Sequence, residues 1–191
     1  TRFLLILNTD QLAQKHTWYT LFEKVVDAQI RLDTSSGESF DIAQSSVSTL
    51  YAPSIRAAVT ICGIRNIRII TKIIRSVHTI LGEQEGLDEA LLSRVIPSTV
   101  LLVGSHYKAV KDGPDVAFIL RTGSTIDLSG FFPHEQNKEK TEIETQEAHW
   151  KLLMNELNIL STDDFELSVA DYLESGMLDS DKVRSIVERY K

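Results

Sequence analysis

GIRNIRIITKIIRSVHTILG, residues 63–82, sets the architecture of this chain. Aliphatic side chains recur in it every three or four positions, a spacing that predicts an amphipathic helix. Asn66 can cap the start of this helix and Gly82 can stop it, so the predicted helix spans residues 67–81. The positions on its apolar side are Ile67, Ile70, Ile74 and Val77.

The opposite side of this helix is basic. Its cations stand three, four and three positions apart, which places them on one helical face. No Asp or Glu occurs between Asp41 and Glu83, so these cations have no partner close in sequence. Two interpretations stay open: a surface that binds phosphate, for which arginine is well suited, and a solvated face that pairs with the acidic C-terminal half. The four residues are Arg65, Arg68, Lys72 and Arg75.

Helical patterns flank this stretch on both sides. Residues 87–110 predict two helices divided at Pro97, since proline disrupts a helix interior. Asp179 or Ser180 can cap the last helix, and Gly176 separates it from the helix before. The other predicted helices cover residues 10–26, 39–50, 53–62, 146–158, 162–174 and 179–190.

Two short strands are predicted near the N-terminus. Residues 3–8 form a continuous apolar run, typical of a parallel strand covered on both faces, and residues 27–32 alternate between apolar and polar. The predicted fold is therefore mostly α with a small α/β remnant at the N-terminus. Its parts are residues 1–33, a helical lid over 34–121, a loop or linker over 122–145 and a C-terminal helical module over 146–191.

The bulk composition excludes several classes of protein. With 42% hydrophobic and 25% charged residues, the chain of 191 residues can bury a core, which argues against disorder. The net charge of −7 argues against nonspecific nucleic-acid binding by the whole chain, and the acidic excess lies in residues 91–191. The single Cys62 excludes a disulfide framework, is predicted to be a small buried residue, and fits a reducing cytoplasm. No apolar run is long enough to cross a membrane.

The common catalytic motifs are absent from the sequence. It holds no G-x-x-x-x-G-K-[ST] loop, no G-x-S-x-G turn and no H-E-x-x-H helix, and its five histidines lack ligand spacing. Ser105 and His106 are adjacent, but no third residue orients them. Asn8 and Asp10 follow the first predicted strand, at the edge where open α/β sheets bind ligands. Capping of the next helix explains this pair more simply.

Three segments, taken in order, resemble the KAP family of P-loop NTPases, which are related to AAA+ and STAND ATPases. The first is the strand with a polar tip, FLLILNTD at residues 3–10. The second is LFEKVV at residues 21–26, followed by AQIRL at residues 28–32. The third is the basic helix, residues 63–75. The resemblance covers about residues 1–80 and departs at residues 33–36, where that family usually has prolines.

This resemblance implies roles for particular residues. Asn8 and Asp10 would lie on the sensor strand, and Lys24 would lie in the segment that faces a neighbouring site. Asn66 and Arg68 would belong to the second sensor helix, on the γ-phosphate side of ATP bound with Mg²⁺. The phosphate-binding half of the site would belong to an ATPase core that precedes these residues.

The main hypothesis is that this chain forms the nucleotide-sensing lid and C-terminal coupling region of a cytoplasmic KAP-like ATPase. On this hypothesis the region has no catalytic activity without the P-loop part of that ATPase. Such an ATPase would serve in bacterial phage defence or a plasmid-linked system, with the C-terminal helices contacting an effector protein or another copy. The start at Thr1, directly before an apolar strand, predicts a longer protein. The alternative is a non-enzymatic helical module that binds protein or, through residues 65–75, nucleic acid.

Overall fold

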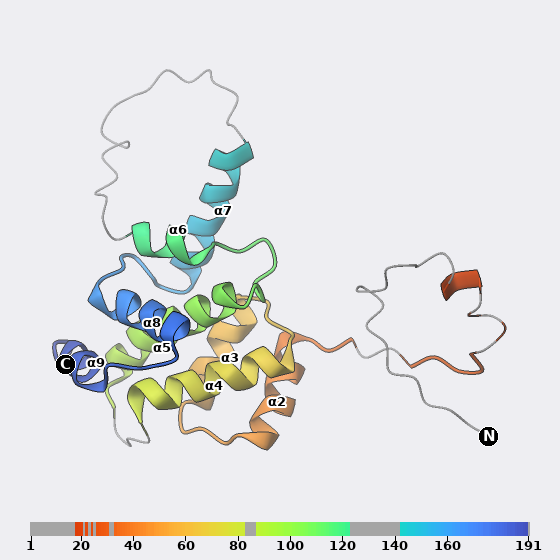
Figure 1. Ribbon diagram of the computed structural model, residues 1–191, viewed down its shortest axis with the longest axis horizontal. Coiled ribbons are helices and arrows are strands. Elements are labelled where there is room, and N and C mark those ends of the chain that lie inside the picture. The colour runs from red at the N-terminus through yellow and green to blue at the C-terminus, as the bar shows by residue number, and fades with distance from the viewer. Residues whose placement is uncertain are drawn as a thin grey trace. The chain divides into compact units, whose positions relative to one another are not determined.

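The structure, a computed structural model, describes residues 18–20, 22, 24, 26–30, 33–82, 87–122 and 142–190. The chain divides into two compact units, Thr1–Asp33 and Thr34–Lys191, which are treated separately below. Every regular element in the described ranges is a helix, which confirms the prediction of a mostly α fold (Figure 1).

The first unit contributes a helical segment but no strand to the described ranges. Residues 18–20, 22 and 24 are helical, and the rings of Trp18 and Phe22 meet edge to face with centroids 5.7 Å apart. The strand predicted over residues 27–32 is wrong for residues 28–30, which form no strand. Ile30 is 96% exposed, so the apolar positions of this alternating segment are not buried as a stable strand would require. The strand predicted over residues 3–8 lies outside the described residues.

The second unit begins with two helices that pack on each other, α2 (Ser36–Ser46) and α3 (Ala52–Ile61). Ser35 starts α2 through a capping box, in which its side chain accepts from the Glu38 amide and the Glu38 carboxylate accepts from the Ser35 amide at 2.8 Å. The prediction missed this motif and therefore placed α2 too late, at residues 39–50.

Helix α4 spans Ile67–Leu81, the bounds predicted from the sequence. Asn66 caps its start by accepting a hydrogen bond from the amide of Arg68 at 3.1 Å. Gly82 ends it with a φ of +67°, a positive value that favours glycine. The local signals at both ends therefore agree with the apolar pattern between them, which is why the bounds were predictable.

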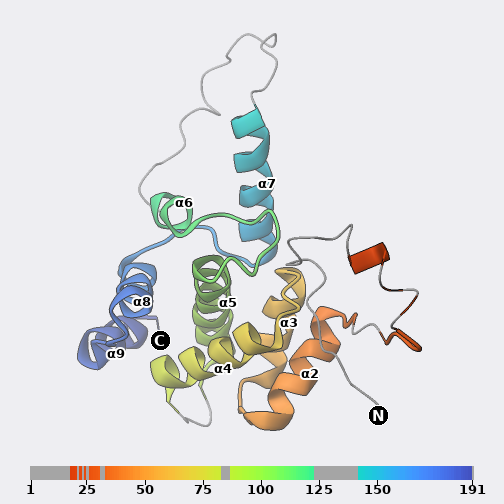
Figure 2. The same cartoon turned by 45° about the vertical axis from the view of Figure 1, so that its right-hand side comes forward.

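Helix α5 (Glu89–His106) runs through the middle of the second unit (Figure 2). The predicted division at Pro97 is wrong, because the helix continues through it. Proline there has no N–H for the carbonyl of Ser93 and costs about 3 kcal/mol relative to alanine. All residues from 98 to 104 are buried, so the part of α5 that follows Pro97 is enclosed on every side. Burial of those side chains outweighs the cost of the proline.

In the described ranges after α5, four further helices follow: α6 (Val116–Arg121), α7 (Glu142–Glu156), α8 (Asp164–Ser175) and α9 (Ser180–Glu188). The last two agree with the prediction, including the turn at Gly176 and the cap at Asp179. The predicted linker ends too late, because residues 142–145 are already helical; residues 123–141 lie outside the described ranges. Helix α6, which Asp115 caps, was not predicted.

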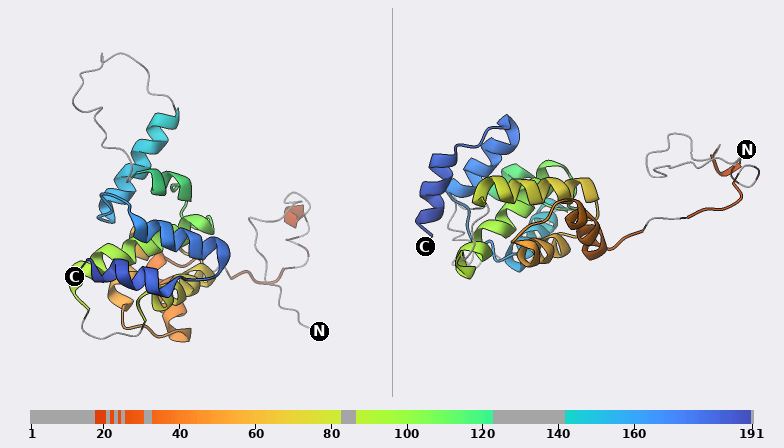
Figure 3. Two further views of the ribbon diagram at one scale, coloured as in Figure 1. Left: turned by 60° about the vertical axis from the view of Figure 1, so that its left-hand side comes forward. Right: turned by 90° about the horizontal axis from the view of Figure 1, so that it is seen from below.

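One hydrophobic core connects these helices. Helix α8 packs against α5, and α9 packs against α8, while the N-terminal half of α7 extends away from the other helices (Figure 3). The buried side chains of residues 146–190 belong to the same core as those of residues 34–122, although the prediction treated the former as a separate module. Fully buried members include Phe40, Ile55, Ile74, Leu101, Ile119 and Phe165.

Candidate anion-binding surface

Helix α4 presents its cations to solvent. We call these residues the basic row; they are Arg65, Arg68, Lys72 and Arg75, and all four are exposed. The opposite side of α4 is fixed in the core by Ile70, Ile74 and Val77, each at most 1% exposed. Arg68 and Arg75 are separated by about 10 Å along the helix axis, at about 1.5 Å per residue. The row is therefore a linear array of positive charge on a rigid support.

The basic row is unfavourable for the helix that carries it. Neighbouring like charges at these spacings destabilise a helix by about 0.2–0.5 kcal/mol per pair, so the two pairs within α4 together cost about 0.4–1 kcal/mol. Arg68 also lies in the first turn of α4, where the helix dipole disfavours cations and where no acidic residue compensates. Charges that weaken their own helix indicate a function other than stability.

Three cations of the row, Arg68, Lys72 and Arg75, have no carboxylate partner in the described part of the chain. Asp164 of α8, by contrast, pairs with Arg189 at 3.5 Å. Of the two interpretations left open by the sequence, the one that pairs this face with the C-terminal half therefore fails for these three cations.

An aromatic ring joins the basic row to the end of α5. The Nζ atom of Lys72 lies 4.2 Å from the centroid of the Tyr107 ring, a cation–π contact. Tyr107 stays 38% exposed, and its ring meets that of His106 edge to face at 4.7 Å. Sequence reasoning missed Tyr107, whose only signal was an aromatic residue between helix α5 and the lysines at 108 and 111.

The turn that carries Tyr107 is held firmly against the start of α4. An added Cβ on Gly104 would lie 2.9 Å from Ile64 Cδ1 and from Val110 Cγ2, so these segments touch closely. Lys108 adopts a φ of +52°, a left-handed conformation that costs a lysine about 1 kcal/mol relative to glycine. A charged, exposed side chain is thus retained beside Tyr107 at a position where glycine is more stable.

The other residues that the resemblance assigns to the sensors belong to different parts of the chain. The side-chain oxygen of Asn66 accepts from the amide of Arg68, so that oxygen serves as a helix cap. Lys24 is exposed and belongs to the first unit. Asn8 and Asp10 lie outside the described residues.

Nucleophilic and metal chemistry find no support in the described ranges. The buried hydroxyl of Ser105 has no hydrogen-bond partner there, so His106 does not activate it. Cys62 is 4% exposed, which confirms the prediction of a small buried residue, and this burial raises the pKa of its thiol to about 12. No group of three or more His, Cys, Asp or Glu side chains in the described part of the chain is placed to hold a metal ion.

A second charged cluster ties helices α5, α8 and α9 together. Arg94 of α5 makes two hydrogen bonds to Glu166 of α8, one of them Nη2 to Oε2 at 3.0 Å. Glu166 is fully buried, whereas the side chain of Arg94 is 23% exposed. Arg94 also donates to Ser98 Oγ at 2.9 Å, and its Nη2 lies 3.4 Å from Asp163 Oδ2. The Tyr190 hydroxyl, just after α9, donates to Asp163 at 2.6 Å.

The ionisation of this cluster follows from these contacts. Burial alone would raise the pKa of Asp163, but hydrogen bonds from Tyr190 and from the Phe165 amide, with the charge of Arg94, bring it below its usual value. Burial, and then the hydrogen bond to Asp163, raise the pKa of Tyr190. Every charged group in the cluster has a partner within the chain, so the cluster is a structural junction rather than a ligand site.

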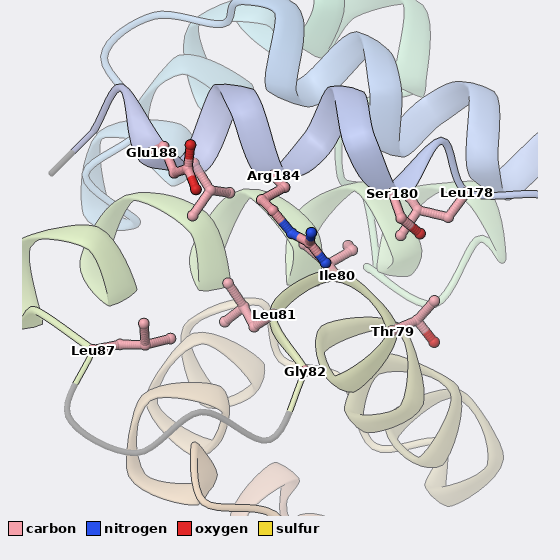
Figure 4. Close-up of a pocket in the computed structure, with 10 residues that line it drawn as sticks. Thr79, Ile80, Leu81, Gly82, Leu87, Leu178, Ser180, Arg184 and Glu188 are labelled. Carbon is pink, nitrogen blue, oxygen red and sulfur yellow. The ribbon is translucent and has the colours of Figure 1, made fainter.

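A pocket of about 220 Å³ lies between the end of α4 and helix α9 (Figure 4). Its walls are about equally polar and apolar: Ile80 and Leu81 of α4 face Arg184 and Glu188 of α9. The Arg184 side chain extends from α9 toward the end of α4 near Ile80. The carbonyl end of a helix attracts cations, so Arg184 complements α4 and leaves little surplus charge for an anionic ligand. The basic row is therefore the stronger candidate.

Comparison with protein-family models, with curated proteins and with solved structures finds no match for this chain. The resemblance to KAP-type ATPases therefore stays a prediction. Among the helices of the described ranges, none combines the length and the apolar composition needed to cross a bilayer.

Proposed function

We propose that the helical bundle of residues 34–190 is a binding module that holds the phosphates of a nucleic acid on the basic row of α4. The proposal is carried by one observation: the row is solvent-exposed, lacks carboxylate partners at Arg68, Lys72 and Arg75 within the described ranges, and weakens its own helix. Positively charged arrays of this kind supply most of the affinity in nonspecific nucleic-acid binding.

The dimensions of the row suit an extended polyanion. Its helical part spans about 10 Å, while the phosphates of one DNA strand advance by about 3.4 Å per nucleotide along the duplex axis. The row is therefore long enough to face more than one phosphate of a strand. Guanidinium groups at three of the four positions favour phosphate oxygens, because each can donate two hydrogen bonds to one phosphate.

The salt dependence of binding tests this proposal. The full chain is titrated into a fluorescein-labelled oligonucleotide, and anisotropy is followed between about 50 and 200 mM salt. We expect affinity to fall steeply with salt. Arg68→Ala and Arg75→Ala should each weaken binding and reduce the slope of log affinity against log salt by about 0.7–0.9. Lys182→Ala on α9 is the matched control and should change neither quantity. Binding that ignores salt, or that falls as much in the control, rules the proposal out.

A second candidate is the nucleotide-sensing lid of a KAP-like ATPase. The observation in its favour is the place of Arg68, which is exposed in the first turn of α4, where backbone amides and helix dipole favour a phosphate. ATP and Mg²⁺ would be held mainly by an ATPase core from another part of the protein. The buried sides of α4 prevent that helix from swinging alone, so the bundle would move as one body. Both candidates fit the cytoplasm, where the Cys62 thiol stays reduced.

The two candidates differ in what Arg75 does. If only the γ-phosphate meets the start of α4, as the resemblance implies, it contacts Arg68 but not Arg75, which lies about 10 Å farther along the helix axis. In a version of the protein extended by the coding sequence upstream, Arg68→Ala would then abolish ATP hydrolysis and Arg75→Ala would not. Equal losses of oligonucleotide affinity in both variants, without any ATPase activity, favour the nucleic-acid module instead.

A further inference from the structure

We propose that the nucleic acid bound by the basic row is single-stranded, and that Tyr107 provides the surface on which one of its bases stacks. This inference rests on the proposed function and specifies its substrate class. The observation behind it is the 4.2 Å contact between Lys72 Nζ and the Tyr107 ring, which places an aromatic face within the row of cations rather than apart from it.

The ring is both accessible and fixed. Tyr107 is 38% exposed, although it follows the most deeply buried helix of the unit. The ring of His106 supports it edge to face, and the amide of Tyr107 donates to the Val103 carbonyl at 3.1 Å. Close packing of Gly104 on Ile64 holds this turn against the start of α4. A ring that is already ordered loses little freedom when a base stacks on it.

Lys72 changes its partner from the Tyr107 ring to a phosphate when the strand binds. In the free protein its ammonium group covers part of the Tyr107 ring. A phosphate beside the row is a stronger partner for that ammonium group than an exposed aromatic ring is. When Lys72 turns to the phosphate, the face that it covered becomes available to the base of the same strand. One side chain thus couples backbone binding to base stacking.

Stacking of this kind distinguishes single strands from duplexes. The bases of a duplex lie against one another and present only their edges, so a tyrosine on a helix surface finds no base face to contact. In a single strand every base has a free face, and aromatic side chains interleaved with cations are the common means of binding it. Lys108, exposed next to Tyr107, extends the positive charge around the ring.

The test compares three probes on the full chain: a short oligothymidylate, an abasic strand of equal length, and a duplex of the same length. All are labelled with fluorescein and read by anisotropy. The oligothymidylate should bind about 5-fold to 150-fold more tightly than the abasic strand, the range expected for one stacked base. Tyr107→Leu should remove this preference without changing the salt slope, whereas Tyr107→Phe should keep it. Tyr172→Leu on α8 controls for loss of a half-buried tyrosine, and circular dichroism verifies that each variant folds.

The outcomes separate this inference from the proposed function. Equal affinity for the oligothymidylate and the abasic strand, with losses in Arg68→Ala and Arg75→Ala, overturns the stacking role of Tyr107 and leaves the phosphate-binding function standing. Tighter binding of the duplex than of the single strand overturns it as well. If no probe binds at about 50 mM salt, the proposed function and this inference fail together.

Discussion

Replacing Arg94 by methionine should destabilise the bundle strongly, because it strips the cation from a carboxylate that has no access to water. Glu166 is 0% exposed and receives two hydrogen bonds from Arg94, one at 3.0 Å. After the substitution Glu166 keeps the hydrogen bond from the amide of Asp163, at 2.8 Å, but loses both donors on Arg94. Removal of one partner of a buried ion pair costs about 3–5 kcal/mol, and we expect the free energy of unfolding to fall by that amount.

The reciprocal change should cost less, because Arg94 is not equally buried. Its side chain is 23% exposed and keeps Asp163 at 3.4 Å, so it can recover solvation when Glu166→Gln removes the charge. We expect a loss of about 1.5–3 kcal/mol, the range for a hydrogen bond to a charged group. The double variant Arg94→Met with Glu166→Met should be more stable than Arg94→Met alone, since it leaves no unpaired charge in the core.

Urea unfolding followed by far-ultraviolet circular dichroism measures these differences. Arg56→Met is the matched control, because its ion pair with Asp41 at 3.1 Å is about half exposed on both sides and should contribute less than about 1 kcal/mol. The reasoning is refuted if Arg94→Met is no worse than Arg56→Met, or if Glu166→Gln costs more than Arg94→Met.

Three further substitutions test other parts of the structure. Pro97→Ala should raise the free energy of unfolding by about 1–3 kcal/mol in urea titrations, because it restores a hydrogen bond in a continuous α5; a loss of stability would favour a helix broken at that residue. Gly104→Ala should lower the free energy of unfolding by about 1–3 kcal/mol, because the new Cβ would lie 2.9 Å from Ile64 Cδ1. An unchanged midpoint of the urea titration would contradict this close packing. The pKa of Asp163 is lower in the folded protein than in the unfolded chain. Its ionised form therefore stabilises the fold above about pH 4, and this stabilisation is lost as the pH falls through the pKa of the folded state. The stability gap between the native protein and Asp163→Asn should therefore narrow below about pH 4, and a gap that widens there would contradict the contacts of Asp163.

Local signals in the sequence predicted α4 completely and α5 only in part. The bounds of α4 follow from an N-cap at Asn66, a terminating Gly82 and a regular apolar pattern, which all act within a few residues. Continuity of α5 through Pro97 depends instead on burial against α3, α4 and α8, which no local pattern reports. The false strand at residues 28–30 has the same origin, since alternation predicts a strand only where one face is covered.

The residues of the candidate surface were likewise predictable from the sequence only in part. The cations of α4 were found from their spacing, because helical periodicity places them on one face whatever the tertiary structure. Tyr107 was not found, because its contact with Lys72 joins residues 35 positions apart through the packing of two helices. The pairing of Arg94 with Glu166 was hidden for the same reason, since 72 positions separate these residues.

The acidic charge of the chain and a nucleic-acid partner are compatible, because charge is distributed unevenly along the bundle. Residues 34–82 hold 5 Lys and Arg against 2 Asp and Glu, whereas residues 142–190 hold 4 against 12. At physiological ionic strength charges are screened over about 8 Å, so a phosphate on α4 interacts mainly with the cations of the basic row beside it. At about 0.01 M salt the screening length grows to about 30 Å, and the C-terminal helices then contribute to repulsion. As salt is lowered to this range, the affinity should therefore rise less steeply than it would for the basic row alone. The acidic helices should also orient the bundle so that α4 faces the strand.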